Sequence, residues 1–236
     1  YDTHPPPHPG RVMKRIEITY FSDLLCIWAW FAQPRIDEVR ANFGDRVVFV
    51  PRYCSVFGDT ARKIPAQWGD KGSYDGFNAH LLHAAQGFPE LTVNPEIWRS
   101  VRPASSLSPH LMLKAVELGA TGGAWDAAVT DAAALALRHA FFVDARDIAD
   151  AGVQRDLLAG AGVDLAVIDA ALASGAAHAA LASDYKDADA LGVQGSPTFI
   201  LNDGRQKLFG NIGYRILEAN IEELLRAPDP DQASWC

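Results

Sequence analysis

The sequence predicts an α/β protein in which a β-α-β unit and a later β-β-α unit are separated by a long helical segment. Three patterns support this prediction. Residues 15–21 alternate apolar and polar side chains, as a half-buried strand does, and a helical pattern follows them. Residues 57–191 have helical spacing with almost no strand pattern. Residues 198–209 are typical of a hairpin, with a last helix behind it.

The first unit begins with the alternating strand. Ser22 and Asp23 follow it and offer polar oxygens where a helix should begin. Apolar side chains then recur at helical spacing over residues 26–43, and Pro34 inside this run predicts a kink. A second apolar strand is expected to end at Pro51. Two strands joined through a helix should be parallel.

The helical segment is expected to contain several separate helices. Ser108 and Pro109 predict a helix start, as an N-cap followed by proline in the first turn. Asp164 is a second expected N-cap. Helices are expected over residues 110–118, 124–142, 164–172 and 176–191, with shorter ones in the Gly- and Pro-rich stretch 60–100.

The chain then returns to strands. Residues 198–201 and 206–209 predict a hairpin around Asn202-Asp203-Gly204, and a closing helix is expected over 214–226. The predicted organisation is a discontinuous α/β domain formed by residues 14–56 and 192–227, with residues 57–191 inserted into it as a helical domain.

Composition excludes some function classes. The 236 residues carry a formal net charge of −8, which argues against nucleic acid as a main partner. No apolar stretch is long enough to predict a membrane span. Residues 1–10 are rich in Pro and His without the apolar core of a signal peptide. The natural start is either Met13 or the end of a removed leader, and we expect a cytoplasmic protein.

Cys26 is the main candidate for a catalytic residue. It stands at the predicted start of a helix, where unpaired N–H groups and the helix dipole favour the thiolate. We therefore expect Cys26 to have the lowest pKa among the three cysteines and to act as a nucleophile. The alternative is a buried, inert core cysteine.

Two motifs resemble one known family. Cys26 follows a strand and opens a helix, and near the end of the chain stands the segment Gly192-Val193-Gln194-Gly195-Ser196-Pro197-Thr198. This combination resembles the DsbA-like branch of the thioredoxin-fold superfamily, which includes kappa-class glutathione transferases and 2-hydroxychromene-2-carboxylate isomerase. The resemblance implies a thioredoxin-like fold with a large helical insertion. The family motif is usually Cys-x-x-Cys, but Ala29 stands in the place of the second cysteine.

The resemblance also implies a binding cleft around Cys26. It implies a cis peptide bond before Pro197 and a Ser196 backbone that pairs with an extended peptide or with glutathione. Trp28 is expected to wall the cleft. The segment 105–110 resembles the Asn-Thr-x-x-Ala-His segment of actinomycete DsbA-like proteins related to FrnE, with Ser-Ser in the place of Asn-Thr, which implies His110 at the cleft; the alternative for His110 is a helix-surface or capping role. Asn211 is expected to contact the ligand because kappa-class enzymes place polar glutathione contacts there.

Three functions are compatible with these motifs. The favoured one is a thiol–disulfide oxidoreductase acting through Cys26 alone, with glutathione or a partner thiol resolving the mixed disulfide. The second is a glutathione-dependent isomerase or transferase, although such relatives usually have Ser in the place of Cys26. The third is a non-catalytic binding module. Cys54, after the second strand, is a less favoured candidate for a resolving thiol.

The expected cofactors and partners follow from the favoured function. No tightly bound cofactor is expected, and glutathione is the expected co-substrate. His80 and His83 could share a helix face, but they lack further ligands at metal-site spacing, so no metal is expected. The partner is expected to be a small thiol or a disulfide-containing peptide or protein, with no nucleic acid and no membrane. The Ala-rich helices would allow a homodimer without requiring one.

Overall fold

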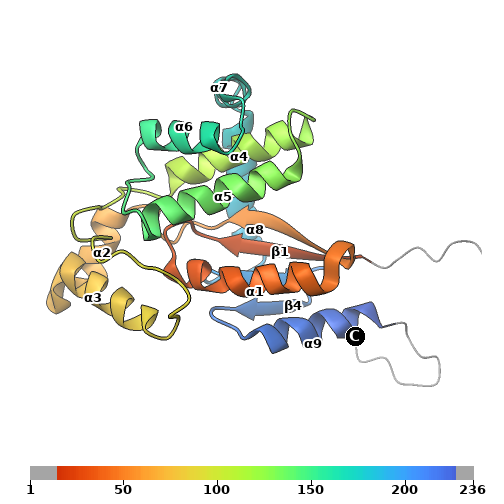
Figure 1. Cartoon of the computed structure of the whole chain (residues 1–236), viewed down its shortest axis with the longest axis horizontal. Coiled ribbons are helices and arrows are strands. Elements are labelled where there is room, and N and C mark those ends of the chain that lie inside the picture. Colours follow the sequence, from red (N-terminus) through yellow and green to blue (C-terminus); the bar gives the residue numbers. More distant parts are fainter. Residues whose placement is uncertain (1–14, 227–236) are drawn as a thin grey trace, which may run out of the picture.

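The computed structural model describes residues 15–226 and has a four-stranded sheet at its centre (Figure 1). The strand order is β2-β1-β3-β4. The predictions on the natural start at Met13 and on the tail cysteine Cys236 lie outside the described residues. The sheet and the helical segment together are the thioredoxin-like α/β arrangement with a helical insertion that the sequence predicts.

The β-α-β unit consists of β1 (Ile16–Ser22), α1 (Ile27–Phe43) and β2 (Val47–Tyr53). β1 and β2 are parallel, as predicted. The predicted end of the second strand at Pro51 is wrong, because β2 continues through this proline to Tyr53. β2 lies at the edge of the sheet, where a strand needs hydrogen-bond partners on one side only and a missing N–H is tolerated.

The helical segment forms seven α-helices and contains no named strand within the described residues. The predicted helix start at Ser108 and Pro109 is wrong, since α4 begins at Leu107 with Ser106 as N-cap. Asp164 caps α7 as predicted, through its side chain and the Ala166 N–H. No helix was predicted at the position of α6. The helices are α2 (Thr60–Trp68), α3 (Ser73–Ala85), α4 (Leu107–Thr121), α5 (Ala127–Phe142), α6 (Ala151–Gly160), α7 (Leu165–Ala173) and α8 (Ala176–Ala190).

The last unit is the predicted hairpin of β3 (Thr198–Leu201) and β4 (Gln206–Phe209), followed by α9 (Tyr214–Leu225). β3 pairs with β1 in the antiparallel direction, with Phe21 opposite Thr198. This pairing brings the start of β3 beside the end of β1. Two segments about 170 residues apart in the sequence therefore meet at the beginning of α1.

Two hydrophobic cores lie on either side of α1. One fills the space between the sheet and helices α1 and α9. The larger core joins the first turns of α1 to the inserted helices, and Trp98, Phe141 and Phe142 are completely buried in it. In Figure 1, α4 and α5 lie along one side of β1 and α1, while α2 and α3 lie beyond the N-terminal end of α1. The start of α1 is therefore enclosed on several sides.

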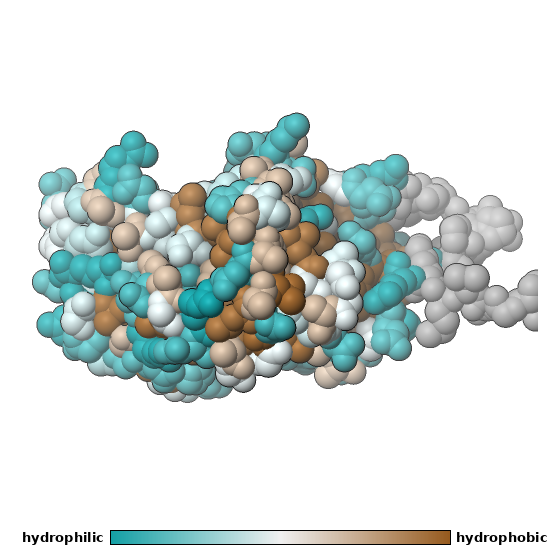
Figure 2. Space-filling model, turned by 90° about the horizontal axis from the view of Figure 1, so that it is seen from above, coloured by the Kyte–Doolittle hydropathy of each residue, from teal (hydrophilic) through white to brown (hydrophobic). Residues whose placement is uncertain are grey.

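The surface has a mixed character. On the face seen in Figure 2, hydrophobic residues gather toward the middle and hydrophilic residues surround them. No single helix within residues 15–226 is long and apolar enough to cross a membrane; α7 and α8 together pass on length and composition but are bent by 72°. The predictions of a cytoplasmic location and of a homodimer remain predictions.

Candidate active site

Cys26 is the N-cap residue of α1. Its carbonyl accepts hydrogen bonds from the Ala29 and Trp30 N–H groups, at 3.1 and 3.2 Å. Its Sγ lies 3.2 Å from the Ser196 carbonyl oxygen, to which the thiol donates. The Ser196–Pro197 peptide bond is cis. The two distant sequence motifs therefore meet directly, through the side chain of one and the backbone of the other.

A second hydrogen bond holds the same two segments together. The Asp23 N–H donates to Ser196 Oγ at 2.9 Å, and both groups are buried. The backbone of the turn before Cys26 is thus fixed to the segment before β3. The Ser196 carbonyl oxygen accepts from the Cys26 thiol and has a second lone pair, so the pairing of the Ser196 backbone with a peptide or glutathione remains a prediction.

The Asp23 carboxylate organises the turn before Cys26. It is fully buried and accepts four hydrogen bonds. One comes from the Leu25 N–H on its own turn, at 2.9 Å. The others come from the Val56 and Phe57 N–H groups, where the insertion begins, at 3.0 and 2.8 Å, and from the Ser106 hydroxyl within the insertion at 2.7 Å. One carboxylate therefore connects the turn before Cys26 to the inserted helical segment.

His110 binds the backbone of the same turn through its ring. Its ring is fully buried, and the Leu24 N–H donates to Nε2 at 3.1 Å. Because Nε2 is an acceptor, the proton of the neutral ring is on Nδ1, which donates to the Tyr185 hydroxyl at 3.1 Å. Burial lowers the pKa of His110 to about 4, with the Asp23 charge opposing this shift. His110 is therefore a neutral positioning group.

The structure contradicts the prediction that Cys26 has a low pKa. Its pKa is raised, and burial is the largest cause; the hydrogen bonds to Ser196 and to α1 backbone groups oppose the shift. The side chain is only 5% exposed. The helix N-terminus does favour the thiolate, but removal from water outweighs it. Cys26 is a protonated thiol at neutral pH.

A pocket of about 280 Å³ opens in front of Cys26. One wall consists of thioredoxin-like residues, including Cys26, Trp28 and Ser196, and the other belongs to α2 and α3 of the insertion. Gly195 allows the Phe209 ring to close one side, because a Cβ there would come within 3.0 Å of that ring. The remaining lining residues are Val56, Phe57, Lys63, Ile64, Gln67, Trp68, Phe77 and Gln194.

The predicted substrate-binding residues separate into two groups. Ser196 and Trp28 line the pocket. Pro197 is buried beside it and accepts the Gly210 N–H with its carbonyl oxygen at 2.9 Å. His110 and Asn211 do not line the pocket: His110 lies behind the Cys26 turn, and the Asn211 side chain accepts from Arg35 at 2.8 Å. We find no direct contact through which these two could reach a ligand in this pocket.

The other thiol does not share the pocket. Cys54 is buried in a small separate cluster with Phe21, Ala188 and Ile200. Burial raises its pKa, and the nearby Asp23 and Cys26 charges act in the same direction. Ala29 is completely buried in the core, one turn into α1. Within the described residues, Cys26 is therefore the only thiol at the pocket wall.

Sequence reasoning missed several residues of this site. Asp23 was noted only as a helix-start residue, and Arg138, which donates to Ser22 Oγ and to the Asp23 carbonyl, was not singled out. A charged residue in the otherwise apolar stretch of α5 is the signal that could have found Arg138. No comparable sequence pattern singles out Lys63. No group of three or more His, Cys, Asp or Glu within residues 15–226 is placed to hold a metal ion.

Comparison with known proteins identifies the class. Residues 111–222 match the model of the family described as DSBA-like thioredoxin domain. This match covers part of the inserted helices and the last β-β-α unit. Together with the thioredoxin-like fold around Cys26 and Ser196, it makes the chain similar to DsbA-like thioredoxin-fold proteins. No curated protein matches the chain.

Solved structures share the fold over nearly the whole chain. A probable DsbA oxidoreductase from Streptomyces coelicolor is 22% identical with a TM-score of 0.69, over 93% of this chain and 94% of that one. The cytosolic disulfide reductase DsbM from Pseudomonas aeruginosa is 22% identical (TM-score 0.65, 87% and 98%), and it is also known with GSH. A 2-hydroxychromene-2-carboxylate isomerase is 19% identical (TM-score 0.59, 88% and 95%).

The neutral state of His110 predicts how stability depends on pH. Its pKa in the folded protein, about 4, lies below the ordinary value of 6.5. Below pH 6.5 the unfolded chain therefore takes up a proton that the folded protein refuses, and stability falls as the pH falls toward 4. Between pH 7 and 5 this amounts to about 2 kcal/mol of unfolding free energy.

Urea unfolding at pH 7 and pH 5 measures this effect. The difference between the two pH values should be about 2 kcal/mol smaller in His110→Gln than in the wild type. His178→Gln, on the exposed face of α8, is the matched control and should keep the wild-type difference. If the unfolding free energy changed equally between pH 7 and pH 5 in the wild type and in His110→Gln, His110 would not be neutral in the folded protein.

Proposed function

We propose that this protein is a thiol–disulfide oxidoreductase that acts through Cys26 alone, with glutathione or another small thiol completing the reaction. The observation that carries the proposal is the position of Cys26. Its Sγ lies at the wall of a 280 Å³ pocket, and a buried Ala29 occupies the place of the usual second thiol. A disulfide that enters the pocket meets one thiol and, among residues 15–226, no resolving partner at the pocket wall.

The reaction consists of two thiol–disulfide exchanges. The Cys26 thiol loses its proton to solvent, and the thiolate attacks one sulfur of the substrate disulfide. A Cys26–substrate disulfide forms, and the other half leaves as a thiol. A glutathione thiolate then attacks the substrate sulfur, which releases Cys26 and forms a glutathione–substrate disulfide. Each step converts one thiol and one disulfide into another thiol and another disulfide, so no further oxidant or reductant is needed.

The raised pKa of Cys26 favours the reducing direction. A thiol of high pKa is a strong nucleophile once deprotonated but a poor leaving group. The Cys26 sulfur therefore attacks disulfides readily at alkaline pH and is displaced slowly afterwards. A long-lived mixed disulfide is the expected consequence. This supports a reductase or a glutathione-exchange enzyme, rather than a donor of disulfides to other proteins.

The pocket supports a small, anionic substrate. Lys63 lines it from α2, and its Nζ lies 5.2 Å from the centre of the Phe57 ring. A neighbouring hollow of about 550 Å³ shares Val56, Lys63 and Gln67 with the pocket and adds Arg62. Lys63, and Arg62 with its ion-pair partner Asp59 at 3.6 Å, lie along these two adjoining spaces, and the cations suit the carboxylates of glutathione. DsbM, a structural neighbour, is known with GSH, which is consistent with this choice.

Incubation with oxidised glutathione tests the proposal. We expect one glutathione adduct per chain, on Cys26, detected by mass spectrometry of the intact protein and of its peptides. Formation should accelerate as the pH rises from 7 to 9, because burial keeps the thiol protonated at neutral pH. An unmodified Cys26 after prolonged incubation at pH 9, in a folded protein, would contradict the proposal.

One observation favours a second candidate function. Cys26 is protonated and donates a hydrogen bond, as a serine hydroxyl would. In a glutathione-dependent isomerase or transferase, this thiol would donate to a bound glutathione thiolate instead of forming a disulfide. A non-catalytic binding module requires neither role. Conjugation of glutathione to 1-chloro-2,4-dinitrobenzene, measured beside disulfide exchange, separates these possibilities.

Restoring the second thiol should change the activity. In Ala29→Cys the new thiol lies one helical turn from Cys26, so it attacks the mixed disulfide within the same molecule. We expect reduction of insulin disulfides without glutathione to rise at least about tenfold over the wild type, because an intramolecular thiol acts at an effective concentration in the millimolar range. Ala29→Ser is the matched control. Equal rates in wild type and Ala29→Cys would show that the wild type already has a resolving thiol.

A further inference from the structure

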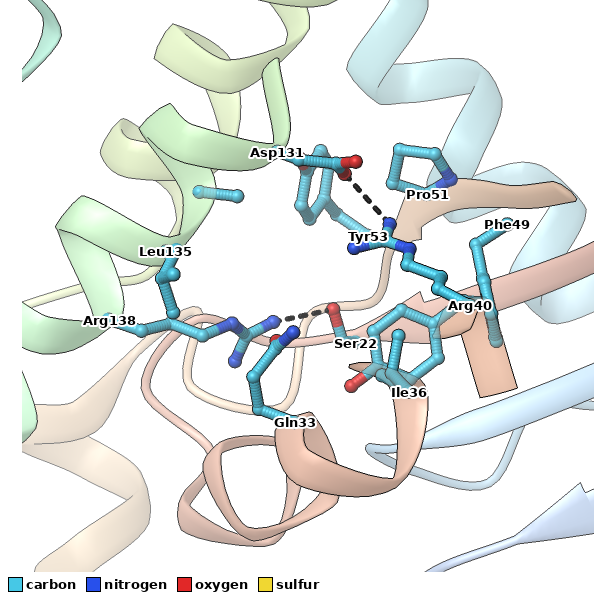
Figure 3. A pocket seen from close by; sticks show the side chains of 12 residues that line it. Ser22, Gln33, Ile36, Arg40, Phe49, Pro51, Tyr53, Asp131, Leu135 and Arg138 are labelled. Atoms are coloured by element: carbon cyan, nitrogen blue, oxygen red, sulfur yellow. Dashed lines mark hydrogen bonds and ion pairs between the residues drawn. The ribbon is translucent and has the colours of Figure 1, made fainter. Parts of the chain in front are cut away.

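A second pocket lies where α1 and α5 meet over the face of β1 and β2 (Figure 3). We call it the wedge pocket; Tyr20, Ser22, Ile36, Leu135 and Arg138 are among its lining residues. Its volume is about 60 Å³. Since one water molecule needs at least roughly 10–15 Å³ of such space, the wedge pocket has room for a few water-sized groups, as a carboxylate group requires.

Arg138 places a positive charge at the wall of the wedge pocket. Its side chain is 4% exposed, and its guanidinium donates to Ser22 Oγ at 2.9 Å and to the Asp23 carbonyl at 3.3 Å. Figure 3 shows the Arg138–Ser22 bond at the edge of the cavity. No carboxylate oxygen lies within 4.0 Å of this guanidinium among residues 15–226. A buried cation without an anion is unfavourable, so the wall is suited to a negative group.

Tyr20 supplies a second donor. It is 8% exposed, and its hydroxyl makes no hydrogen bond of 3.5 Å or less among the described residues, although the Ser22 hydroxyl is close enough to lower its pKa slightly. Burial raises the pKa of Tyr20 to about 12, with the Arg138 charge opposing the shift, so the hydroxyl keeps its proton. A buried hydroxyl without a partner is destabilising unless a ligand or water accepts from it. Tyr20 and Arg138 thus offer donors to one small cavity.

The mouth of the wedge pocket is crossed by an ion pair. Arg40 on α1 and Asp131 on α5 are 3.0 Å apart, and Figure 3 shows them joined beside the cavity. Both residues also line an adjoining groove of about 410 Å³ along β2. The groove includes the apolar side chains of Val48 and Val50. The cavity therefore has a cationic inner end and continues past a partly exposed ion pair into a groove that has apolar residues of β2 on one wall and charged residues such as Arg52 and Glu117 elsewhere.

We propose that the wedge pocket binds a small monocarboxylic acid. The carboxylate accepts hydrogen bonds from Arg138 and Tyr20, and the short apolar end points toward the groove along β2. A carboxylate matches this cavity because it brings the missing negative charge and two acceptor oxygens in few atoms. The site is separate from Cys26, so its occupancy does not depend on the proposed disulfide chemistry.

Calorimetric titration of the full chain with sodium propionate, and with propionamide at the same ionic strength, tests the proposal. We expect binding of propionate and none of propionamide. Tyr20→Phe removes only a hydroxyl that has no protein partner, so its melting temperature should equal or exceed that of the wild type. Its affinity for propionate should fall about tenfold or more. Tyr74→Phe, in α3, is the matched control and should bind as the wild type does.

Two further variants define the outcome. Arg138→Gln, if folded by circular dichroism, should lose propionate binding. Arg40→Ala should retain it, because Arg40 stands at the mouth and not at the inner end. Equal affinity for propionamide, unchanged affinity in Tyr20→Phe, or loss of binding only in Arg40→Ala would each overturn the proposal. The last result would mean that the anion is attracted to the exposed ion pair.

Discussion

Cys26→Ser should abolish disulfide exchange, with a loss of at least about a thousandfold in rate. A hydroxyl cannot form the mixed disulfide, and no other thiol lines the pocket within the described residues. The fold should survive, because the serine hydroxyl can still donate to the Ser196 carbonyl that now accepts from Sγ. The measurement is the rate of glutathione-dependent disulfide reduction, with circular dichroism as the folding check.

Cys54→Ser is the matched control for this variant. Cys54 is equally buried but lies in a separate cluster, so its replacement should leave the exchange rate near that of the wild type. If Cys54→Ser were as inactive as Cys26→Ser, Cys54 would be the resolving thiol. If Cys26→Ser lost exchange but kept glutathione conjugation to chlorodinitrobenzene, the thiol would act as a hydrogen-bond donor, as in the isomerase-like alternative.

Asp23→Ala should cause the largest loss of stability, about 3–5 kcal/mol of unfolding free energy. The carboxylate accepts three backbone N–H groups and the Ser106 hydroxyl, all buried or partly buried. Alanine leaves these donors without a partner and without access to water. Since the bonds come from both the Cys26 turn and the insertion, the variant should also loosen the contact between them.

Urea unfolding and thiol alkylation together test this role. Asp59→Ala is the matched control, because Asp59 is exposed and accepts a single backbone N–H, from Arg62. Removal of the Asp59 side chain should lower the free energy of unfolding by only about 1 kcal/mol. In Asp23→Ala, Cys26 should react faster with iodoacetamide at pH 7, since its protection comes from burial. A stability loss no larger than that of Asp59→Ala would contradict the role of Asp23 as the central acceptor.

Local patterns were sufficient to predict the strands that surround Cys26. The alternation over residues 15–21 and the apolar run at Val47 predicted two parallel strands, and the turn at Asn202-Asp203-Gly204 predicted the hairpin. These features depend on the period of the side chains and on turn chemistry, which neighbouring residues determine. The resemblance of two short motifs then placed Cys26 and Ser196 at one site, although the segment between them is longer than 160 residues.

The errors have a common cause, which is competition from distant parts of the chain. Ser108 and Pro109 have the residue types of a helix start, but Ser106 starts α4 and its hydroxyl bonds to Asp23. Pro51 is a plausible strand end, but it is tolerated on an edge strand, and edge position is a property of the whole sheet. His110 was expected to line the cleft, but its ring accepts from the Leu24 N–H and does not line the pocket.

The sequence by itself determined which chemistry is available: a cysteine at a helix start, an alanine in the place of its usual partner, and a Ser-Pro segment returning to it. Only the tertiary structure decided the state of that cysteine. The inserted helices and the Asp23 network enclose the start of α1, and removal from water raises the pKa of Cys26 although the helix end favours the thiolate. Burial is a sum over contacts from the entire chain, so no local pattern around Cys26 contains it.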